Sequence, residues 1–341
     1  MVEEQTYYQT AGSLLRPFLL MTSTTPRGYS VPLQRKITDF GADVPFGKVG
    51  EKLMEHYGIN APISSIRNIT LNHAEILLAL QDTALGQALA PAQAVIISET
   101  DGSMVPMVTS RPLFEGEVVD RRKGKILSYR EARLTLAHAQ GSATPVFAAI
   151  IGNVDQVGHH MSRCVNIVGL DQKTHIHAVG DGAPWIADQI DKHFGAQASY
   201  LVDFYHLCEY LSAAAPHCAP GFEIAWRKQQ EALLKNSLAA DVLLALKPYI
   251  EPENIDDNQA PVRLCYRYMT NRLEQLDYKS AIEKGLPIGS GEIESAHRYV
   301  IQKRLKIAGA WWSEGNIKSM LALRVNRANN DWNDYWNNKA A

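Results

Sequence analysis

The sequence predicts an α/β protein in which a sheet is followed by a long helical segment. Three observations carry this prediction. Short apolar runs alternate with helical patterns between residues 94 and 203, strand patterns stop after residue 203, and a glycine-rich stretch then opens a last group of helices. The chain has 341 residues, of which 46% are hydrophobic and 21% charged. This composition is typical of a globular protein and excludes a disordered or collagen-like one.

The N-terminal part carries helical patterns before the first strand. Two helices are expected, at Phe46–Tyr57 and Pro62–Leu80, because Gly58 suits the position after a helix end and a proline opens the second helix. Such a pair is typical of a helix-turn-helix, whose second helix would present Arg67 and Asn68 to DNA. Two packed helices of a small bundle are an equally frequent alternative.

Five segments are expected to form the strands. Ala94–Ser98 is an apolar run with an acidic end, and Arg130–His138 alternates polar with apolar side chains at the period of a strand. The other predicted strands are Pro145–Ile151, His175–Gly180 and Ala198–Val202, and a helix is expected at Asp155–Val168. Strands that alternate with helices favour a sheet flanked by helices.

A helical segment follows the last strand, because residues 204–278 show no convincing strand pattern. Its apolar residues step by three and four, as on one face of an amphipathic helix, and residues 250–260 form an acidic break. That face consists of Val262, Tyr266, Met269, Leu273 and Leu276. The glycine-rich stretch Gly285–Gly291 then leads into a helix that is expected to run through Ile301 and Leu305.

The charge of the chain is nearly balanced but unevenly distributed. The 34 Lys and Arg and 36 Asp and Glu give 34 − 36 = −2, whereas Lys279–Arg327 holds nine basic and four acidic residues, 9 − 4 = +5. A basic tract of this kind suits the phosphates of nucleic acid. Four cysteines without CxxC spacing favour a reducing, cytoplasmic setting, and no apolar run approaches membrane-spanning length, so no membrane partner is expected.

Three acidic residues occupy positions that suit a metal site. Asp101 and Asp181 follow predicted strands, and Glu294 lies in the first turns of a helix. Mg²⁺ prefers carboxylate oxygens, and two ions about 3.5–4 Å apart can activate an attacking oxygen and stabilise a leaving one. Without a cation, clustered carboxylates repel one another. Taken singly, each acid also has a structural explanation, a tight turn at either aspartate and a solvated helix face at the glutamate.

Two other chemistries find weaker support. His175 and His177 share a strand face and could bind zinc with Cys164, but no fourth ligand stands at a recognisable spacing. The stretch Gly289–Gly291 could cradle a phosphate, but it lacks the Gly-Lys-Ser/Thr ending of a P-loop. No nucleotide cofactor is therefore expected.

Several short strings, in order along the chain, carry a family resemblance. They are Thr100-Asp-Gly-Ser-Met-Val-Pro106, Ser128-Tyr-Arg-Glu-Ala-Arg133, Gly180-Asp-Gly-Ala-Pro-Trp-Ile186, Asp203-Phe-Tyr-His206, Ile288-Gly-Ser-Gly-Glu-Ile-Glu-Ser-Ala-His297, Lys303-Arg-Leu-Lys306 and Gly309-Ala-Trp-Trp312. With a helical block before the last acidic string, this set resembles the DDE transposases of bacterial insertion sequences. It is most similar to the Kra-type group, which is related to Mutator-like transposases. The resemblance runs from about Phe46 to Trp336.

The resemblance implies an RNase H-like catalytic core, a mixed sheet flanked by helices, that is interrupted by an all-helical insertion. The acids of the family's catalytic triad map onto Asp101, Asp181 and Glu294, with Glu292 in reserve for the third position. Asp203 and His206 match an element that supports the site in related enzymes. The metal implied is Mg²⁺ or Mn²⁺, with two ions expected.

Four parts are expected along the chain. An N-terminal helical, DNA-binding region spans 1–90, and the first part of the catalytic core spans 91–204. The all-helical insertion spans 205–284, and the final Glu-bearing helix with the basic C-terminal helices spans 285–341.

The activity implied is metal-dependent cleavage of DNA at the ends of a mobile element, followed by transfer of the freed 3′-hydroxyl into target DNA. The partners expected are DNA and a second copy of the chain, since two element ends must be handled. The residues expected to contact DNA are Arg67, Asn68, Arg298, Lys303, Arg304, Lys306 and Trp312. The alternatives are a catalytically inactive DNA-binding protein derived from such an enzyme, and an RNase H-like nuclease without strand transfer.

Overall fold

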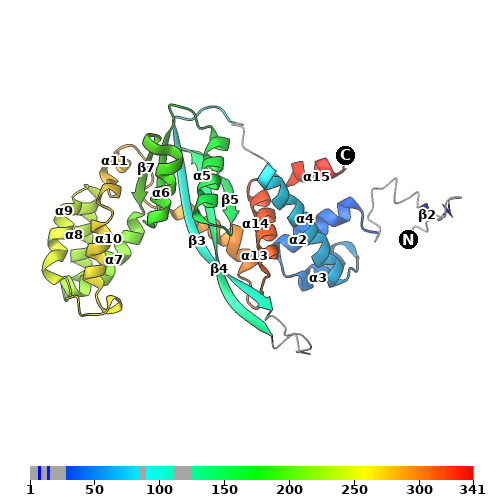
Figure 1. Ribbon diagram of the computed structural model, residues 1–341, viewed down its shortest axis with the longest axis horizontal. Helices are drawn as coiled ribbons and strands as arrows, with labels where there is room; N and C mark the ends of the chain where they lie inside the picture. The colour runs from blue at the N-terminus through cyan, green and yellow to red at the C-terminus, as the bar shows by residue number, and fades with distance from the viewer. Residues whose placement is uncertain (1–6, 9–13, 16–27, 84–89, 111–123, 341) are drawn as a thin grey trace. The chain divides into compact units, whose positions relative to one another are not determined.

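The computed structural model describes residues 7–8, 14–15, 28–83, 90–110 and 124–340 (Figure 1). The described residues fall into two compact units. One unit, here the helical unit, takes its residues from 1–84, 104–130 and 298–341. The other, here the sheet unit, takes its residues from 85–103 and 131–297. The sequence also indicates a basic turn at Arg121–Lys125, of which the structure describes only Gly124 and Lys125.

The helical unit contains the expected pair of helices and a further helix before it. Helix α3 spans Phe46–Tyr57 as predicted, and Gly58 ends it in the left-handed conformation, with φ 63°. Its N–H donates to Met54 O, which satisfies a carbonyl at the helix end. The remaining helices are α2 Val31–Asp43, α4 Ile63–Thr83, α13 Lys303–Leu305, α14 Glu314–Ala328 and α15 Trp332–Ala340, and β1 Tyr7–Tyr8 pairs with β2 Leu14–Leu15.

An apolar cluster holds the three N-terminal helices together. Ile37 of α2, Val49 and Leu53 of α3 and Ile66 of α4 are all fully buried in it. Helix α14 packs along α4 and also contacts α2. The helices at the two ends of the chain therefore share one unit.

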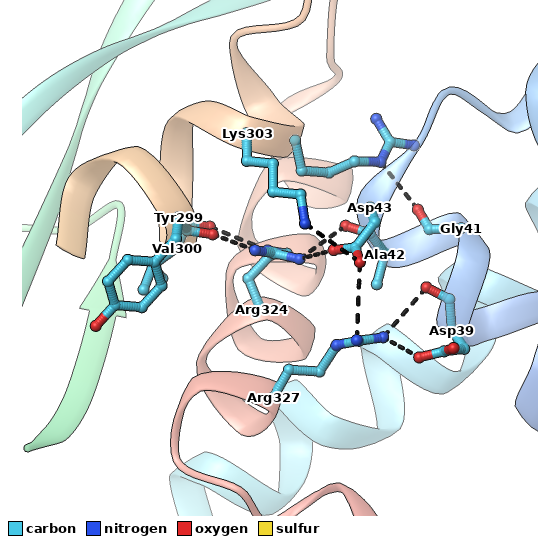
Figure 2. A network of polar contacts seen from close by, with 10 residues as sticks. Asp39, Gly41, Ala42, Asp43, Tyr299, Val300, Lys303, Arg324 and Arg327 are labelled. Carbon is cyan, nitrogen blue, oxygen red and sulfur yellow. Dashed lines mark hydrogen bonds and ion pairs between the residues drawn. The ribbon is translucent and has the colours of Figure 1, made fainter. Parts of the chain in front are cut away.

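A polar network joins the end of α2 to α14 (Figure 2). The Asp43 carboxylate contacts the guanidinium group of Arg324, and it lies 3.5 Å from Lys303 Nζ and 3.7 Å from an Arg327 nitrogen. Arg324 also donates to the carbonyls of Tyr299 and Val300, which lie within a π-helical stretch, His297–Gln302. One buried arginine thus ties two segments of this unit to α14.

The sheet unit is built on a five-stranded mixed sheet in the order β5-β4-β3-β6-β7. The strands are β3 Val95–Ser110, β4 Lys125–Ala139, β5 Val146–Ile150, β6 His175–Gly180 and β7 Ala198–Val202. Strands β3, β6 and β7 run parallel, and β4 pairs with β5 antiparallel. All five predicted strands are present, and the mixed α/β fold class is confirmed.

Strand β3 is far longer than the predicted strand Ala94–Ser98, so the predicted end of this strand is wrong. It continues through Asp101 and Gly102 to Ser110, so the hairpin turn considered at these two residues is wrong. The continuation is stabilised by the neighbouring strand β4, where the Thr100 hydroxyl donates to Thr135 Oγ1 at 2.9 Å. Asp101 is therefore held within a strand and not on a loop.

Helices cover both faces of this sheet (Figure 1). Ile96 packs with helices α5 Val154–Val168 and α6 Pro184–Phe194, whereas Ile97 packs with the helical segment. Successive side chains of a strand point to opposite faces. Glu99 and Asp101 therefore share the face of Ile97, on the side of the helical segment.

The helical segment follows β7 without any strand among its described residues, as predicted. Its helices are α7 Phe204–Cys218, α8 Glu223–Lys235, α9 Ala239–Leu246, α10 Pro261–Thr270 and α11 Tyr278–Glu283, with short 3₁₀ turns at Lys247–Tyr249, Asp257–Gln259 and Leu273–Gln275. A further 3₁₀ turn, Gly195–Gln197, precedes β7. The expected amphipathic helix is corrected at its end, because α10 stops at Thr270 and Leu276 reaches the same core from beyond a turn.

The glycine-rich stretch leads into helix α12, Gly291–Ala296. The chain then forms a π-helical stretch, His297–Gln302, before α13. The single regular helix expected through Leu305 is therefore interrupted. Across the ranges that the structure describes, no helix combines the length and apolarity needed to cross a membrane.

Candidate functional site

Asp101 and Asp181 lie side by side because their strands are parallel neighbours in the sheet unit. The register pairs Val95 with His175 and continues to Glu99 with Val179. Carried two residues further, the same register places Asp101 opposite Asp181, just past the end of β6. Neighbouring strands lie about 4.8 Å apart, so the two carboxylates share one corner of the sheet.

The surroundings of Asp101 disfavour the negative charge of its carboxylate. Burial raises its pKa above the ordinary value, and the neighbouring carboxylates of Asp181 and Glu131 raise it further. The Gly102 N–H, which donates to Asp101 Oδ1 at 2.6 Å, offsets part of this rise, as does His206. The other oxygen lies 3.3 Å from His297 Nε2. The surroundings therefore favour a positive charge at this point.

The loop that carries Asp181 is held mainly through its backbone. Asp181 Oδ1 accepts a hydrogen bond from Ala183 N at 2.8 Å, which caps the turn into α6. The Gly182 N–H donates to the Tyr200 hydroxyl at 3.0 Å. Gly182 has φ +81°, a conformation that glycine adopts without the steric cost other residues meet.

Helix α12 is attached to strand β3 by a buried glutamate. Glu99, only 2% exposed, accepts a hydrogen bond from Ile293 N through Oε2 at 2.8 Å. Burial raises the pKa of Glu99 to about 8; the Ile293 N–H opposes the rise, while Glu292, Asp203 and Glu294 add to it. The first turn of α12 thus lies against the same strand face as Asp101.

Glu292 and Glu294 both lie in that first turn, with exposed side chains. Glu292 Oε2 is 3.1 Å from His138 Nε2 of strand β4. Both glutamates are close enough to Glu99 to raise its pKa. The structure brings both near the aspartates' strand, and the choice of Glu294 over Glu292 as the third acid stays a prediction.

Asp203 has a well-defined structural task. One carboxylate oxygen accepts from the N–H groups of Tyr205 and His206, at 2.6 and 3.0 Å, and so caps helix α7. The other oxygen accepts from Ser290 N at 2.7 Å and from the Ser290 hydroxyl. Asp203 therefore connects the start of the helical segment to the start of α12, which suits the supporting role expected for it.

His206 lies on the first turn of α7. Its Nδ1 is 3.4 Å from Glu209, and its ring stands edge-on to Tyr268, with centroids 6.0 Å apart. The histidine is close enough to Asp101 to lower the pKa of that carboxyl. His206 thus lies at the edge of the cluster of acidic side chains around Asp101.

The donor chemistry suits a hard divalent cation. Carboxylate oxygens are what Mg²⁺ and Mn²⁺ prefer, and no described Lys or Arg forms an ion pair with Asp101 or Asp181. As placed, however, the described His, Cys, Asp and Glu side chains contain no group of three or more that could hold a metal ion. The structure thus provides a neighbouring pair of acids, with candidates for a third on α12.

The zinc alternative is wrong on geometric grounds. Cys164 is buried on the α5 and α6 side of the sheet, and burial raises the pKa of its thiol. His177 points to the other face, where its Nε2 bonds to Pro287 O at 2.8 Å. The sheet therefore separates the proposed ligands.

The residues expected to contact DNA divide into exposed and buried ones. Arg67 and Asn68 are exposed on α4, and Arg298, Lys303 and Lys306 are exposed on the C-terminal tract. Arg304 is only 2% exposed. Its Nε donates to Gly41 O at 2.9 Å, and its guanidinium carbon lies 4.7 Å from the ring centroids of Phe46 and of Trp312.

These contacts correct two predictions. Arg304 stabilises the packing of α2 and α3 and does not face a DNA backbone. Trp312, 6% exposed, packs edge-on against Phe46 with centroids 6.3 Å apart, so its ring is not available to stack on a base.

Sequence reasoning also missed residues that shape the site. In the sequence, Glu99 was only one residue of an acidic strand end. Because it stands two residues before Asp101, both side chains lie on the same strand face, and this spacing could have indicated that Glu99 is close to the site. Tyr268 and Arg272, which contact the Asp181 loop, carried no sequence signal because they lie far along the chain, in and just after α10.

No curated protein matches this sequence significantly. Among solved structures, the chain is similar to the Drosophila P element transposase strand transfer complex at 10% identity and a TM-score of 0.33. The similarity covers 93% of this chain and 83% of the other. A family model for the uncharacterised protein family UPF0236 matches residues 166–337, slightly more than half of the chain, and includes Asp181, the helical segment and α12. The chain therefore belongs to the uncharacterised protein family UPF0236.

Proposed function

We propose that this protein is a DDE-type transposase that cuts and joins DNA with an RNase H-like core. The observation that carries the proposal is the parallel register of β3 and β6, which sets Asp101 beside Asp181. The bond from Ile293 N to Glu99 supports it, since it fixes the acidic first turn of α12 to the same strand. The ordered strings that resemble Kra-type transposases match these positions.

In this proposal Asp101, Asp181 and Glu294 hold Mg²⁺ or Mn²⁺, with Glu292 as the alternative third ligand. A bound divalent cation supplies charge that activates the attacking oxygen and stabilises the leaving oxygen of a phosphodiester. Asp101 is prepared for such a charge, because its pKa is raised by burial and by Asp181. Asp203 keeps the starts of α7 and α12 together, and Glu99 keeps α12 on the sheet.

The reaction class is phosphoryl transfer on DNA. Water would first cleave a phosphodiester and free a 3′-hydroxyl, which would then attack a target phosphodiester. Exposed Arg298, Lys303 and Lys306 would contact DNA phosphates, and Arg67 and Asn68 on α4 would contact the element ends. A homodimer would handle two ends at once.

One observation favours a second candidate, a DNA-binding protein without catalysis. The described side chains contain no group of three acids and histidines that could hold a metal. A protein of this kind would bind DNA through its basic side chains and would need no metal.

The deciding experiment compares the wild type with Asp181→Asn on plasmid DNA that carries the natural flanks of the gene. Asp188→Asn is the matched control, because Asp188 is an exposed aspartate of α6, the helix that follows the Asp181 loop. The proposal expects the wild type and Asp188→Asn to cut and join DNA only with Mg²⁺ or Mn²⁺, and Asp181→Asn to do neither. Cutting without joined products would identify a nuclease, and equal DNA binding without cutting by all three would favour the second candidate.

A further inference from the structure

Two side chains of the helical segment hold the loop that carries Asp181. The Tyr268 hydroxyl donates to Asp181 O at 2.6 Å, and Arg272 Nε donates to Gly182 O at 2.6 Å. Both acceptors are backbone carbonyls, so these bonds leave the Asp181 carboxylate available. All of these residues belong to the sheet unit.

The two donors are themselves fixed by their neighbours. The Arg272 guanidinium carbon lies 4.0 Å from the Tyr268 ring centroid, and Arg272 also donates to Tyr268 O at 3.1 Å. Tyr210 of α7 stacks on Tyr268, with centroids 4.3 Å apart and an angle of 19° between the rings. Burial raises the pKa of Tyr268, which keeps its hydroxyl protonated and able to donate.

The loop is shaped to accept these donors. A Cβ at Gly182 would lie 2.5 Å from the Tyr268 hydroxyl oxygen and 2.6 Å from Arg272 Nε. Such distances are far below van der Waals contact, so only glycine allows the approach. Glycine at position 182 therefore leaves the space in which Tyr268 and Arg272 reach the loop.

We infer that Tyr268 and Arg272 are positioning residues that set where Asp181 stands relative to Asp101. The helical segment thus has a task at the candidate site, since it determines the geometry of one of the two neighbouring acids. This inference rests on the proposed function for its consequence, metal binding by Asp181, but the loop geometry can be tested by itself.

The first test removes one donor and keeps the ring. Tyr268→Phe loses the bond to Asp181 O and retains the stack on Tyr210. Tyr210→Phe is the matched control, because its hydroxyl makes no hydrogen bond with the loop. With one positioning bond lost, we expect Tyr268→Phe to weaken Mn²⁺ binding, measured by calorimetry on the full chain, about five- to tenfold. Tyr210→Phe should bind Mn²⁺ like the wild type.

A DNA cleavage assay distinguishes a role of Tyr268 in positioning Asp181 from a general loss of stability. In Tyr268→Phe the Mn²⁺ concentration for half-maximal DNA cleavage should rise by the same factor, while the rate at saturating Mn²⁺ recovers towards wild type. Arg272→Lys, which retains a charge and a donor, should fall between the wild type and Arg272→Ala. Equal Mn²⁺ affinity in Tyr268→Phe and the wild type would overturn the inference.

A second measurement does not depend on metal binding. Hydrogen exchange of the Gly182 and Ala183 amides reports how firmly the loop is held. We expect faster exchange in Tyr268→Phe and unchanged exchange in Tyr210→Phe; equal exchange in both would overturn the inference. If the wild type binds no Mn²⁺ while the exchange still differs, the proposed function fails and the positioning of the loop stands.

Discussion

At the scale of single residues, Glu99 is an acid that lies almost completely out of contact with water. It is buried and accepts one hydrogen bond, and its pKa is about 8 against an ordinary 4.5. A raised pKa means that the folded protein favours the protonated carboxyl. The stability that this contributes is fully present below about pH 4.5 and is lost as the pH rises through about 8.

The substitution Glu99→Gln keeps the shape of the side chain and an oxygen that accepts from Ile293 N, but it removes the ionisable carboxyl. Without metal, we expect the melting temperature of the wild type to fall between pH 5 and pH 9 more steeply than that of Glu99→Gln. At pH 9 the variant should be more stable by several degrees, because no buried charge forms. Thermal unfolding across this range measures the difference, and parallel curves would contradict the pKa assigned to Glu99.

The residues of the site differ in how far the sequence revealed them. Asp101 and Asp181 were predicted from acidic positions after apolar runs, a pattern that is local. Tyr268 and Arg272 act on backbone carbonyls that lie far away in the chain, and such contacts leave no local pattern. Arg304 belonged to a basic string, but its aromatic neighbours became apparent only in the fold.

At the scale of elements, the network around Asp43 fastens helix α2 to helix α14 (Figure 2). Burial alone would raise the pKa of Asp43. The positive charges of Arg324, Arg327 and Lys303 outweigh burial and lower it below the ordinary 3.8. The resulting stability is present above about pH 4 and is lost as the pH falls through the lowered pKa.

We therefore expect Asp43→Asn to destabilise the helical unit by about 1–2 kcal/mol at pH 7, since Arg324 would keep a buried charge without its carboxylate. The difference should shrink below pH 4. Glu51→Gln is the control, because it breaks an exposed pair with Lys48 and should change the free energy of unfolding by less than about 0.5 kcal/mol. Urea unfolding at pH 7 and pH 3 gives both values; equal losses for the two variants would refute this role of Asp43.

Element boundaries were predictable where a local signal ends the element. Gly58 stops α3 at the expected residue. The π-helical stretch His297–Gln302 was not predictable, because an extra residue in a helical turn has no composition of its own. Arg324 reaches carbonyls of that stretch from α14, so a distant side chain helps to satisfy it.

At the scale of the whole molecule, the mixed α/β fold class followed from the alternation of strands and helices. The division into four consecutive parts stays a prediction. That helices near both ends of the chain share one unit was not visible in the sequence, because amphipathic patterns show which face is buried but not against which partner.

DNA binding by the whole chain gives the last prediction. Arg298→Ala and Lys306→Ala remove exposed charges, so each should weaken binding to any DNA sequence and lower the slope of log affinity against log salt by about one. Neither should change stability by more than about 0.5 kcal/mol. Arg304→Ala should instead unfold at a lower temperature, because it removes a buried side chain. Titrations at several salt concentrations and thermal unfolding check both; an unchanged salt slope for Arg298→Ala and Lys306→Ala would contradict DNA contact by this tract.

The register of β3 and β6 has a consequence for finding distant relatives. Backbone pairing sets the distance between Asp101 and Asp181, whatever the length of chain between them. The hairpin and helix in between can therefore gain or lose residues without moving either acid. A single residue added inside β6 would turn its side chains to the opposite face of the sheet. Alignments should accordingly allow free gaps between the two acidic strings and none within the strands that precede them.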